Sequence, residues 1–586
     1  MQNPKKLVWL LSLTAVLKSL SITTACNEGT AANHPNLPRR PCVGCGKSLS
    51  LSEFHHWMRE HSPMGLLNGV TRRQRAKRKR PVSFHGRADD PETQTPVPSI
   101  LEVVSRAIFL GLTFTPVVFL AIFAALSRAF RNRVWFPLLV RTLATCGAAF
   151  IKWGQWASTR PDMFPESLCS ALAPLTHMAP THSWKHTKVK VERELGCKLE
   201  EYFDQFDRKP LASGSVAQVY KATLCGHPVA VKVTHPKVAE QISLDFRLMA
   251  ILAAIIDSIP GLGFLNLKAS MDQFSHTMAG QARLDVEADH LDLFNHNFRR
   301  WKDTKFPIPL FKSYDVLIES YEDGMLISAY SLLYQQAQKK EQQLMGEPFP
   351  ALVGRGGSPE PALAHFIVTR GEHVYLKMLL VDNLMHADLH PGNILVKSSL
   401  KDGNAICVLD AGMVARLTEE EQRNFIGFIA NLARGNGNRA AKYILNFSTT
   451  QTCTEDQKMN FIRDIELLFE EKCRGYGTGT QVADVLCGAL TLIRKHQVRI
   501  DANYATLIMN ILCLDGLVQD LQPEYSIIDG AKVLLDMHSI LKWPLVGKLV
   551  FRIGYPLAEL WKKRSDRRFW KHLQKTRVKR AQQSMD

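Results

Sequence analysis

Lys232 constrains the fold more than any other residue, because it interrupts an apolar strand. The run Ala-Val-Lys-Val, residues 230–233, ends a stretch that alternates like two strands around a turn at Gly226. An ammonium group buried in such a strand is costly unless an anion pairs with it. The chain must therefore bring a carboxylate or an anionic ligand to this strand. A lysine at the edge of the sheet, with its head group in water, is the alternative.

Glu287 is the partner that the sequence offers. A helix is expected from about residue 274 to 298, and Glu287 follows Leu284 by three positions and precedes Leu291 by four. This spacing places its carboxylate on the apolar face of the helix, where it needs a cation. We therefore predict that Glu287 pairs with Lys232, with an exposed helix carboxylate as the alternative.

A second set of polar residues follows in the run His-Ala-Asp-Leu-His-Pro-Gly-Asn at 386–393. Asp388 is suited to orient or deprotonate an acceptor hydroxyl, and Asn393 with Asp410 of Leu-Asp-Ala-Gly can hold Mg²⁺ between phosphates. Lys232, the helix glutamate and these three residues occur in the order found in protein kinases. The sequence thus predicts a kinase-like site that uses ATP and Mg²⁺, with Lys232 meeting the α and β phosphates.

Two departures from an ordinary kinase affect the expected chemistry. Ala387 replaces the arginine that would pair with a phosphorylated activation segment, so control by such phosphorylation is not expected. The nucleotide loop is poor in glycine and therefore stiffer, which predicts a different nucleotide pose. Glu319 marks the expected hinge between the lobes, where a plain strand and turn is the alternative. The loop and strand residues expected at the nucleotide are Ala212, Ser213, Gly214, Ser215 and Val219.

Residues 107–127 carry no charge over 21 positions, which is long enough to cross a hydrocarbon core of roughly 30 Å. Arg106 and Arg128 flank them. We predict a transmembrane helix, and a buried helix is the alternative. Arg131 and Arg133 add positive charge on the C-terminal side, so the positive-inside tendency places the rest of the chain on the inner side of the membrane.

Residues 1–80 are typical of a targeting leader followed by a basic linker. Lys5 and Lys6 precede an apolar stretch with no acid before Glu28, which fits a secretory signal or a mitochondrial presequence. The basic run at 72–80 and the scarcity of acids favour the mitochondrion. We predict the mitochondrial inner membrane, with the kinase-like part facing the matrix, and the endoplasmic reticulum membrane is the alternative.

The net charge of +18 is concentrated in blocks, one of which is the tail at 551–586. Its aromatic residues, Trp561, Phe569 and Trp570, lie among basic residues, a mixture suited to an anionic membrane lipid such as cardiolipin. A solvated basic helix is the alternative. Nucleic acid is not expected as a partner, because no stacking or groove-reading motif accompanies the charge.

The segment Phe-Ile-Lys-Trp-Gly-Gln-Trp-Ala-Ser-Thr-Arg-Pro-Asp, residues 150–162, together with the alanine-bearing loop and the 386–393 run, resembles the UbiB family of aarF-domain-containing atypical kinases. The resemblance implies a helical extension over the active site, with Lys152 and Gln155 at the nucleotide. It favours ATP hydrolysis or a small-molecule or lipid acceptor over protein phosphorylation, and a role with coenzyme Q biosynthetic proteins or in lipid metabolism. The family's Glu-x-Asp pair is replaced here by Gln281 and Arg283.

The expected fold is therefore α+β: a two-lobed protein-kinase-like fold with an N-terminal helical extension, preceded by a transmembrane helix. Three functions remain open, namely a membrane-anchored atypical kinase or ATPase, a nucleotide- and lipid-binding pseudokinase scaffold, and, less favoured, a conventional serine/threonine kinase. The expected parts after the membrane helix are the extension at 134–205, the N-lobe and hinge at 206–328, an insert at 335–362 and the C-lobe at 363–550.

Overall fold

The structure is a computed structural model. The residues it describes are 99–158, 164–177, 181–259, 267–268, 271, 275, 281–344, 361–399, 403–448, 451, 453–478 and 480–540. The predicted leader and the basic tail lie outside these residues, as does most of the predicted insert.

Helices make up the first described part of the chain. α5 (Ile100–Leu126) begins with a capping box, in which the Ser99 hydroxyl accepts from the Glu102 amide and the Glu102 carboxylate accepts from the Ser99 amide. The helical segments after α5 are α6 (Arg128–Phe130), η3 (Arg131–Trp135), α7 (Phe136–Cys146), α8 (Ala148–Ser158), α9 (Glu166–Leu172), η4 (Ala173–His177), α10 (Trp184–Leu195) and α11 (Leu199–Tyr202). An apolar cluster that includes Leu143, Phe150 and Leu172 packs α7, α8, α9 and η4 against α5.

The N-lobe is an antiparallel sheet in the order β1-β3-β4-β7-β6, with β2 paired to β3. Alternation along β4 decides which side chains face which helix. Val229, Val231 and Val233 point into an apolar cluster with α10, whereas Lys232 points to the other face, toward α14 (Leu284–Phe298). The strands are β1 (Gln205–Phe206), β2 (Ala212–Ser213), β3 (Ala217–Leu224), β4 (His227–Thr234), β6 (Pro309–Lys312) and β7 (Val316–Ser320).

The C-lobe is mainly helical and contains the largest apolar cluster of the described chain. α15 (Ile327–Leu344) continues ten residues into the segment predicted as an insert, and α16 (Pro361–Lys377) follows that segment. The other helical segments are η6 (Met378–Asp382), η7 (Pro391–Asn393), α17 (Glu419–Ala433), α18 (Gly437–Leu445), α19 (Glu455–Lys472), α20 (Val482–Lys495), α21 (Ala502–Leu521) and α22 (Ile527–Ile540).

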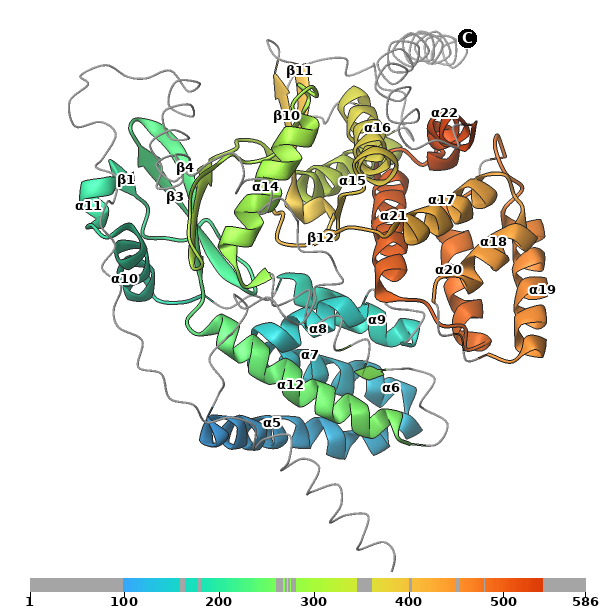
Figure 1. Cartoon of the computed structure of the whole chain (residues 1–586), viewed down its shortest axis with the longest axis horizontal. Helices are drawn as coiled ribbons and strands as arrows, with labels where there is room; N and C mark the ends of the chain where they lie inside the picture. Colours follow the sequence, from blue (N-terminus) through green and yellow to red (C-terminus); the bar gives the residue numbers. More distant parts are fainter. Residues whose placement is uncertain are drawn as a thin grey trace, which may run out of the picture. The chain divides into compact units, whose positions relative to one another are not determined.

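Short strands flank the segments that contain the predicted site residues Asp388, Asn393 and Asp410. β10 (Ile394–Ser399) and β11 (Gly403–Val408) form a hairpin that β5 (Thr304–Lys305) and β8 (Met325–Leu326) extend on either side, and β9 (Met385–His386) pairs with β12 (Val414–Ala415). The strand-rich lobe and the helix-rich lobe adjoin along α14, with the N-terminal helices below (Figure 1). The predicted α+β, two-lobed kinase-like fold with a helical extension is confirmed.

Two helices of the described chain are long and apolar enough to cross a membrane. One is α5, of whose most apolar window 17% is buried, and the other is the segment Asn503–Leu521 within α21, at 61%. The second is a core helix of the C-lobe, whose Leu507, Ile508 and Val518 belong to the large cluster. α5 is therefore the candidate membrane helix, as the sequence predicts.

One ion pair ties α5 to the kinase-like part. α12 (Val238–Asp257) follows β4 and packs its inner side against α8, with Ile242 and Phe246 in a shared cluster. From α12, Asp245 receives a bidentate pair from Arg106 of α5, at 2.7 and 2.8 Å. Arg106, predicted only as a charge that flanks the membrane segment, is thus also a structural residue.

We expect Arg106→Met to destabilise the protein by about 3–5 kcal/mol, because it leaves the carboxylate of Asp245, only 1% exposed, without a cation. The thermal unfolding midpoint of the detergent-solubilised chain measures the loss. The double variant Arg106→Met, Asp245→Leu should recover most of it, since no buried charge remains. Arg193→Met is the control, because that side chain is 62% exposed. Equal midpoints for Arg106→Met and the control would contradict this assignment.

Candidate functional site

Lys232 lies between two buried carboxylates, as the apolar strand requires. Its Nζ is 2.5 Å from Oε1 of Glu287 on α14 and 3.1 Å from Oε1 of Glu319 on β7. It also donates to the Leu409 carbonyl at 3.2 Å, one residue before Asp410. The pair with Glu287 has the predicted geometry. Glu319 lies one residue before the end of β7, close to the expected hinge, but its side chain turns back to the lysine.

Burial and charge act against each other in this group. Burial opposes the charge on Lys232, but Glu287, Glu319 and Asp410 outweigh it and raise its pKa. For Glu319, burial prevails over Lys232 and raises the pKa to about 8. Within the described chain, Oε2 of Glu319 is buried without a hydrogen-bond partner. Lys232 is thus charged, and Glu319 carries a proton over much of the neutral range.

The catalytic loop is held by His386 from β9. The Nε2–H of His386 donates to the Asp410 carbonyl, and its Nδ1 accepts from the Asp388 amide at 3.1 Å. Asn510 of α21 donates to the His386 carbonyl at 2.7 Å. Burial lowers the pKa of His386, so the ring stays neutral and can donate at one nitrogen and accept at the other. This ring fixes the predicted catalytic aspartate relative to the predicted metal ligand.

Asn393 and Asp410 are joined by the backbone. The side chain of Asn393 donates to the Asp388 carbonyl at 3.2 Å, and its own carbonyl accepts from the Leu409 amide at 2.9 Å. The carboxylate of Asp410 accepts from the Gly412 amide at 2.7 Å. Burial opposes ionisation of Asp410, but Lys232, the Gly412 amide and Lys152 outweigh it and lower its pKa. The Asp410 carboxylate and the Asn393 amide oxygen are both oxygen donors of the kind that suits Mg²⁺.

Lys152 of α8 contacts the predicted catalytic residue directly. Its Nζ lies 3.8 Å from Oδ2 of Asp388, across 236 positions of sequence. The resemblance implies a Lys152 role at the nucleotide site, and the structure brings it to the catalytic loop. Gln155 is used differently, because its side-chain amide donates to the Leu175 carbonyl at 3.1 Å. Gln155 therefore orders the helical extension itself.

Two histidines that were not predicted from the sequence, His235 and His182, support the nucleotide loop. β2 contains Ala212 and Ser213, Ser215 is buried in the loop, and Val219 lies on β3 beside Lys232 in register. The Gly214 carbonyl accepts from Nε2 of His235 at 2.8 Å. The Nδ1 atoms of His235 and His182 lie 2.7 Å apart.

The directions of these hydrogen bonds can be assigned. A carbonyl only accepts, so His235 carries its proton on Nε2 and accepts at Nδ1 from His182. The other nitrogen of His182 then accepts from the Thr187 hydroxyl, 2.8 Å away. Burial lowers the pKa of His235, and burial together with His235, His186 and Lys190 lowers that of His182 to about 3, so both rings are neutral. The loop is thus held by a hydrogen-bonded chain that begins in the helical extension.

Gln281 lies beside the Asp-Ala-Gly segment, where the family has an acid. Its Cγ is close to Gly412, at 3.9 Å from where a β-carbon on that glycine would lie. Arg283 pairs with Asp285 at 2.7 Å and lies over the Tyr314 ring. In the described part of the chain, Oε1 of Gln281 is buried without a hydrogen-bond partner. Of the two replacements, Gln281 is the one next to the predicted metal ligands.

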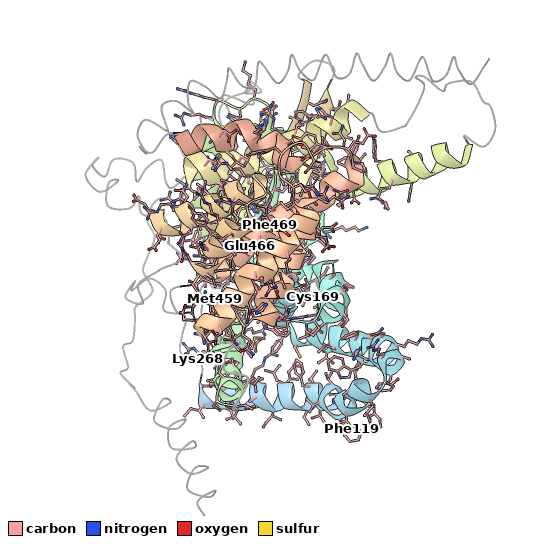
Figure 2. The ribbon with its side chains drawn as sticks, turned by 90° about the vertical axis from the view of Figure 1, so that its right-hand side faces the viewer. Phe119, Cys169, Lys268, Met459, Glu466 and Phe469 are labelled. Carbon is pink, nitrogen blue, oxygen red and sulfur yellow. The ribbon has the colours of Figure 1, made fainter. Side chains whose placement is uncertain are left out.

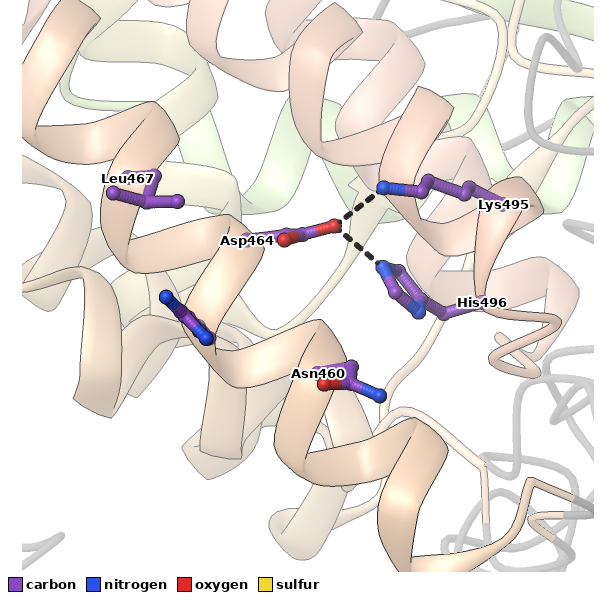
Figure 3. Close-up of a pocket in the computed structure, with 6 residues that line it drawn as sticks. Asn460, Asp464, Leu467, Lys495 and His496 are labelled. Atoms are coloured by element: carbon purple, nitrogen blue, oxygen red, sulfur yellow. Dashed lines mark hydrogen bonds and ion pairs between the residues drawn. The ribbon is translucent and has the colours of Figure 1, made fainter.

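A shallow hollow between α19 and α20 lies apart from this group. Asp464 accepts there from Lys495 at 2.7 Å and from His496 at 2.8 Å (Figure 3). The Asp464 carboxylate is thus paired with two neighbouring side chains, and the hollow contains none of the predicted site residues. We assign it no catalytic role.

Three features were not predicted from the sequence: the side-chain contact of Glu319 with Lys232, the hydrogen bonds of His386 to both aspartates, and the two histidines that contact the nucleotide loop. His386 could have been identified, because it is the first residue of the motif at 386–393. Glu319 could also have been identified, because it lies in the apolar run Val-Leu-Ile-Glu-Ser and, like Lys232, is a charged residue inside a strand. No local pattern joins His182 to His235, which lie 53 residues apart.

We expect Glu319→Gln to raise the thermal midpoint more at pH 8 than at pH 6. A carboxyl whose pKa is raised on folding stabilises the protein below its unfolded value of about 4.3, and this stability is lost as the pH rises through about 8. Glutamine removes that pH dependence. Glu470→Gln, an exposed carboxylate on α19, is the control. An equal shift at both pH values would show that Glu319 is ionised throughout.

We expect His235→Phe to weaken Mg-ATP binding about fivefold, since loss of one hydrogen bond to the loop costs about 1 kcal/mol. Calorimetric titration measures the dissociation constant. His227→Phe, at the opposite end of β4, is the control. Unchanged affinity in His235→Phe would show that the chain of histidines does not position the loop.

Comparison with known proteins places this part of the chain near one group of kinase-like proteins. Residues 174–444 match the family model described as the ABC1 atypical kinase-like domain. The probable serine/threonine-protein kinase abkC of Dictyostelium discoideum is 29% identical over 468 residues, which cover 68% of this chain and 64% of that protein. The mitochondrial ABC1 family protein YPL109C of Saccharomyces cerevisiae is 28% identical, covering 69% and 68%. The probable protein kinase UbiB of Aeromonas salmonicida is 28% identical, covering 70% and 71%.

Among solved structures, a Rv3197–erythromycin complex from Mycobacterium tuberculosis is 18% identical and covers 69% of this chain and 98% of its own. Its TM-score of 0.34 is too low to support a conclusion. Residues 174–444 are thus similar to the ABC1 atypical kinase-like domain, and the chain is similar to the UbiB proteins over about 70% of its length.

Proposed function

We propose that this chain is a membrane-associated atypical kinase or ATPase of the UbiB type that binds Mg-ATP. The observation that supports this proposal is one connected group of side chains across both lobes. It consists of Lys232, Glu287, Asp388, Asn393 and Asp410. Such a group needs long-range folding to assemble, and its members have the residue types that phosphoryl transfer requires.

Each residue of the group has a distinct proposed role. Lys232, held by Glu287, would pair with the nucleotide phosphates, and Asn393 with Asp410 would hold Mg²⁺, which neutralises phosphate charge when bound. The depressed pKa of Asp410 keeps this ligand ionised at neutral pH. Asp388 would orient the attacking hydroxyl or water and take its proton.

The contact between Lys152 and Asp388 bears on the acceptor. The ammonium group occupies one side of the carboxylate that would receive the acceptor proton. α8 thus narrows the approach that an extended peptide would need. We propose water, a small molecule or a lipid as the acceptor, in preference to a protein.

The cellular role is proposed from the relatives and from α5. Two fungal relatives are named as mitochondrial ABC1 family proteins. We propose the mitochondrial inner membrane with the kinase-like domain on the matrix side, a contribution to coenzyme Q biosynthesis or lipid metabolism, and contact with anionic lipid. We also propose that, within the family, the chain is most like aarF-domain-containing kinase 2.

Gln281 favours a second candidate, a nucleotide- and lipid-binding scaffold without turnover. It puts an amide where the family has an acid, next to Gly412 and the Asp410 carboxylate. An amide contributes less charge than a carboxylate to a metal site, which would weaken metal binding.

We expect Mg-dependent ATP hydrolysis by the full chain in cardiolipin-containing vesicles, and a loss of about 100-fold or more in Asp388→Asn and in Asp410→Asn. Phosphate release measures the rate. Asp464→Asn, the same change in the remote hollow, should retain the parental rate. Undiminished turnover in both site variants would overturn the assigned roles. Nucleotide binding without turnover would favour the scaffold, and Gln281→Glu would then be expected to restore a measurable rate.

A further inference from the structure

We propose that α5 does not meet the membrane alone: the C-terminal half of α12 forms part of the same lipid-contacting surface. The membrane-facing residues are Ile251, Leu252 and Ile255 of α12 and Ile259, two residues beyond the end of the helix, and together we call them the α12 stripe. The proposal rests on the membrane association proposed above, but it does not depend on ATP turnover.

The α12 stripe is exposed and apolar, although the helix around it is well packed. The four side chains are 48%, 58%, 58% and 46% exposed. The spacing of Ile251, Leu252 and Ile255 places them along one side of α12, and Ile259 follows just after the helix end. The opposite side is occupied, because Ile242 and Phe246 pack against α8 and Met249 packs against the cluster of α7, α8 and α9. A contiguous apolar side on a fixed helix indicates a partner.

α5 offers a surface of the same kind. Its inner side contacts the protein along its length: Arg106 pairs with Asp245, Leu110 and Phe114 pack on the apolar cluster, and the Val117 carbonyl accepts from the Trp135 indole at 2.8 Å. Only the outer side of α5 is therefore available to lipid. That side carries Ile108, Leu112, Val118, Phe119, Ile122, Phe123 and Leu126, all exposed. Figure 2 shows Phe119 projecting from α5 on the side away from the kinase-like lobes.

The two helices are placed to share one partner. The ion pair between Arg106 and Asp245 joins the first turns of α5 to the middle of α12, and Met249 packs on the same cluster as Leu110 and Phe114. Figure 1 shows α12 and α5 in the same part of the molecule, below the lobes. Since the two helices are joined at this ion pair and in this cluster, we place their exposed sides at one bilayer.

The charges around this surface match an anionic bilayer better than a protein partner. Residues 103–161 contain no Asp or Glu. Arg128, Arg133 and Arg141 are exposed on α6, η3 and α7, next to the apolar side of α5. Exposed arginines beside a long apolar helix are the arrangement by which proteins bind the headgroup region of anionic membranes.

The test places a fluorescent non-natural amino acid at position 255 of the full chain, reconstituted in phosphatidylcholine vesicles with cardiolipin. We expect blue-shifted emission that is quenched by lipids labelled with nitroxide on the acyl chain and protected from aqueous iodide. The matched control carries the same amino acid at Met459 of α19, which is 62% exposed and apolar but remote from α5. The control probe should respond to iodide and not to the labelled lipid.

A probe at 255 that responds like the control would overturn the proposal. A blue shift that grows with protein concentration, without quenching by labelled lipid, would show a second copy of the chain on the stripe and overturn it as well. The substitutions Leu252→Gln and Ile255→Gln, made together, should lower the fraction bound to vesicles while leaving the thermal midpoint in detergent unchanged, since both side chains are exposed. The rate of ATP hydrolysis is measured separately, so failure of the proposed enzymatic activity would leave these results unaffected.

Discussion

The pairing of Lys232 with buried carboxylates is the interaction on which the rest of the structure depends. A charge inside β4 must be compensated, and Glu287 and Glu319 can do so only if α14 crosses the sheet and β7 pairs beside β4. The same lysine reaches the Leu409 carbonyl of the C-lobe. One ammonium group thus sets the relation between sheet, helix and second lobe, and the proposed phosphate site follows from that relation.

The helical extension takes part in this arrangement through two separate contacts. Lys152 reaches Asp388 from α8, and His182 reaches the nucleotide loop through His235. One contact bears on the acceptor side of the site and the other on the nucleotide side. A shift of the extension would therefore alter both halves of the site together.

The sequence predicts those parts of the site that obey a local rule. The pair between Lys232 and Glu287 follows from a charge in an apolar strand and a carboxylate on an apolar helix face, and α5 from an uncharged run. It does not predict that Glu319 turns inward, that Gln155 serves the extension, or that Arg106 binds Asp245. Those outcomes depend on which segments meet in space, and a residue 139 positions away leaves no trace in a local pattern.

The pair between Arg106 and Asp245 also determines how the protein can be divided. A chain trimmed to begin after α5 would keep the buried carboxylate of α12 and lose the arginine that pairs with it, and the Cys146 carbonyl would lose the same donor. The part of the chain after α5 is therefore not a separate folding unit, because α5 supplies the cation that its buried carboxylate needs. Removing the proposed membrane helix would also destabilise the domain that follows it.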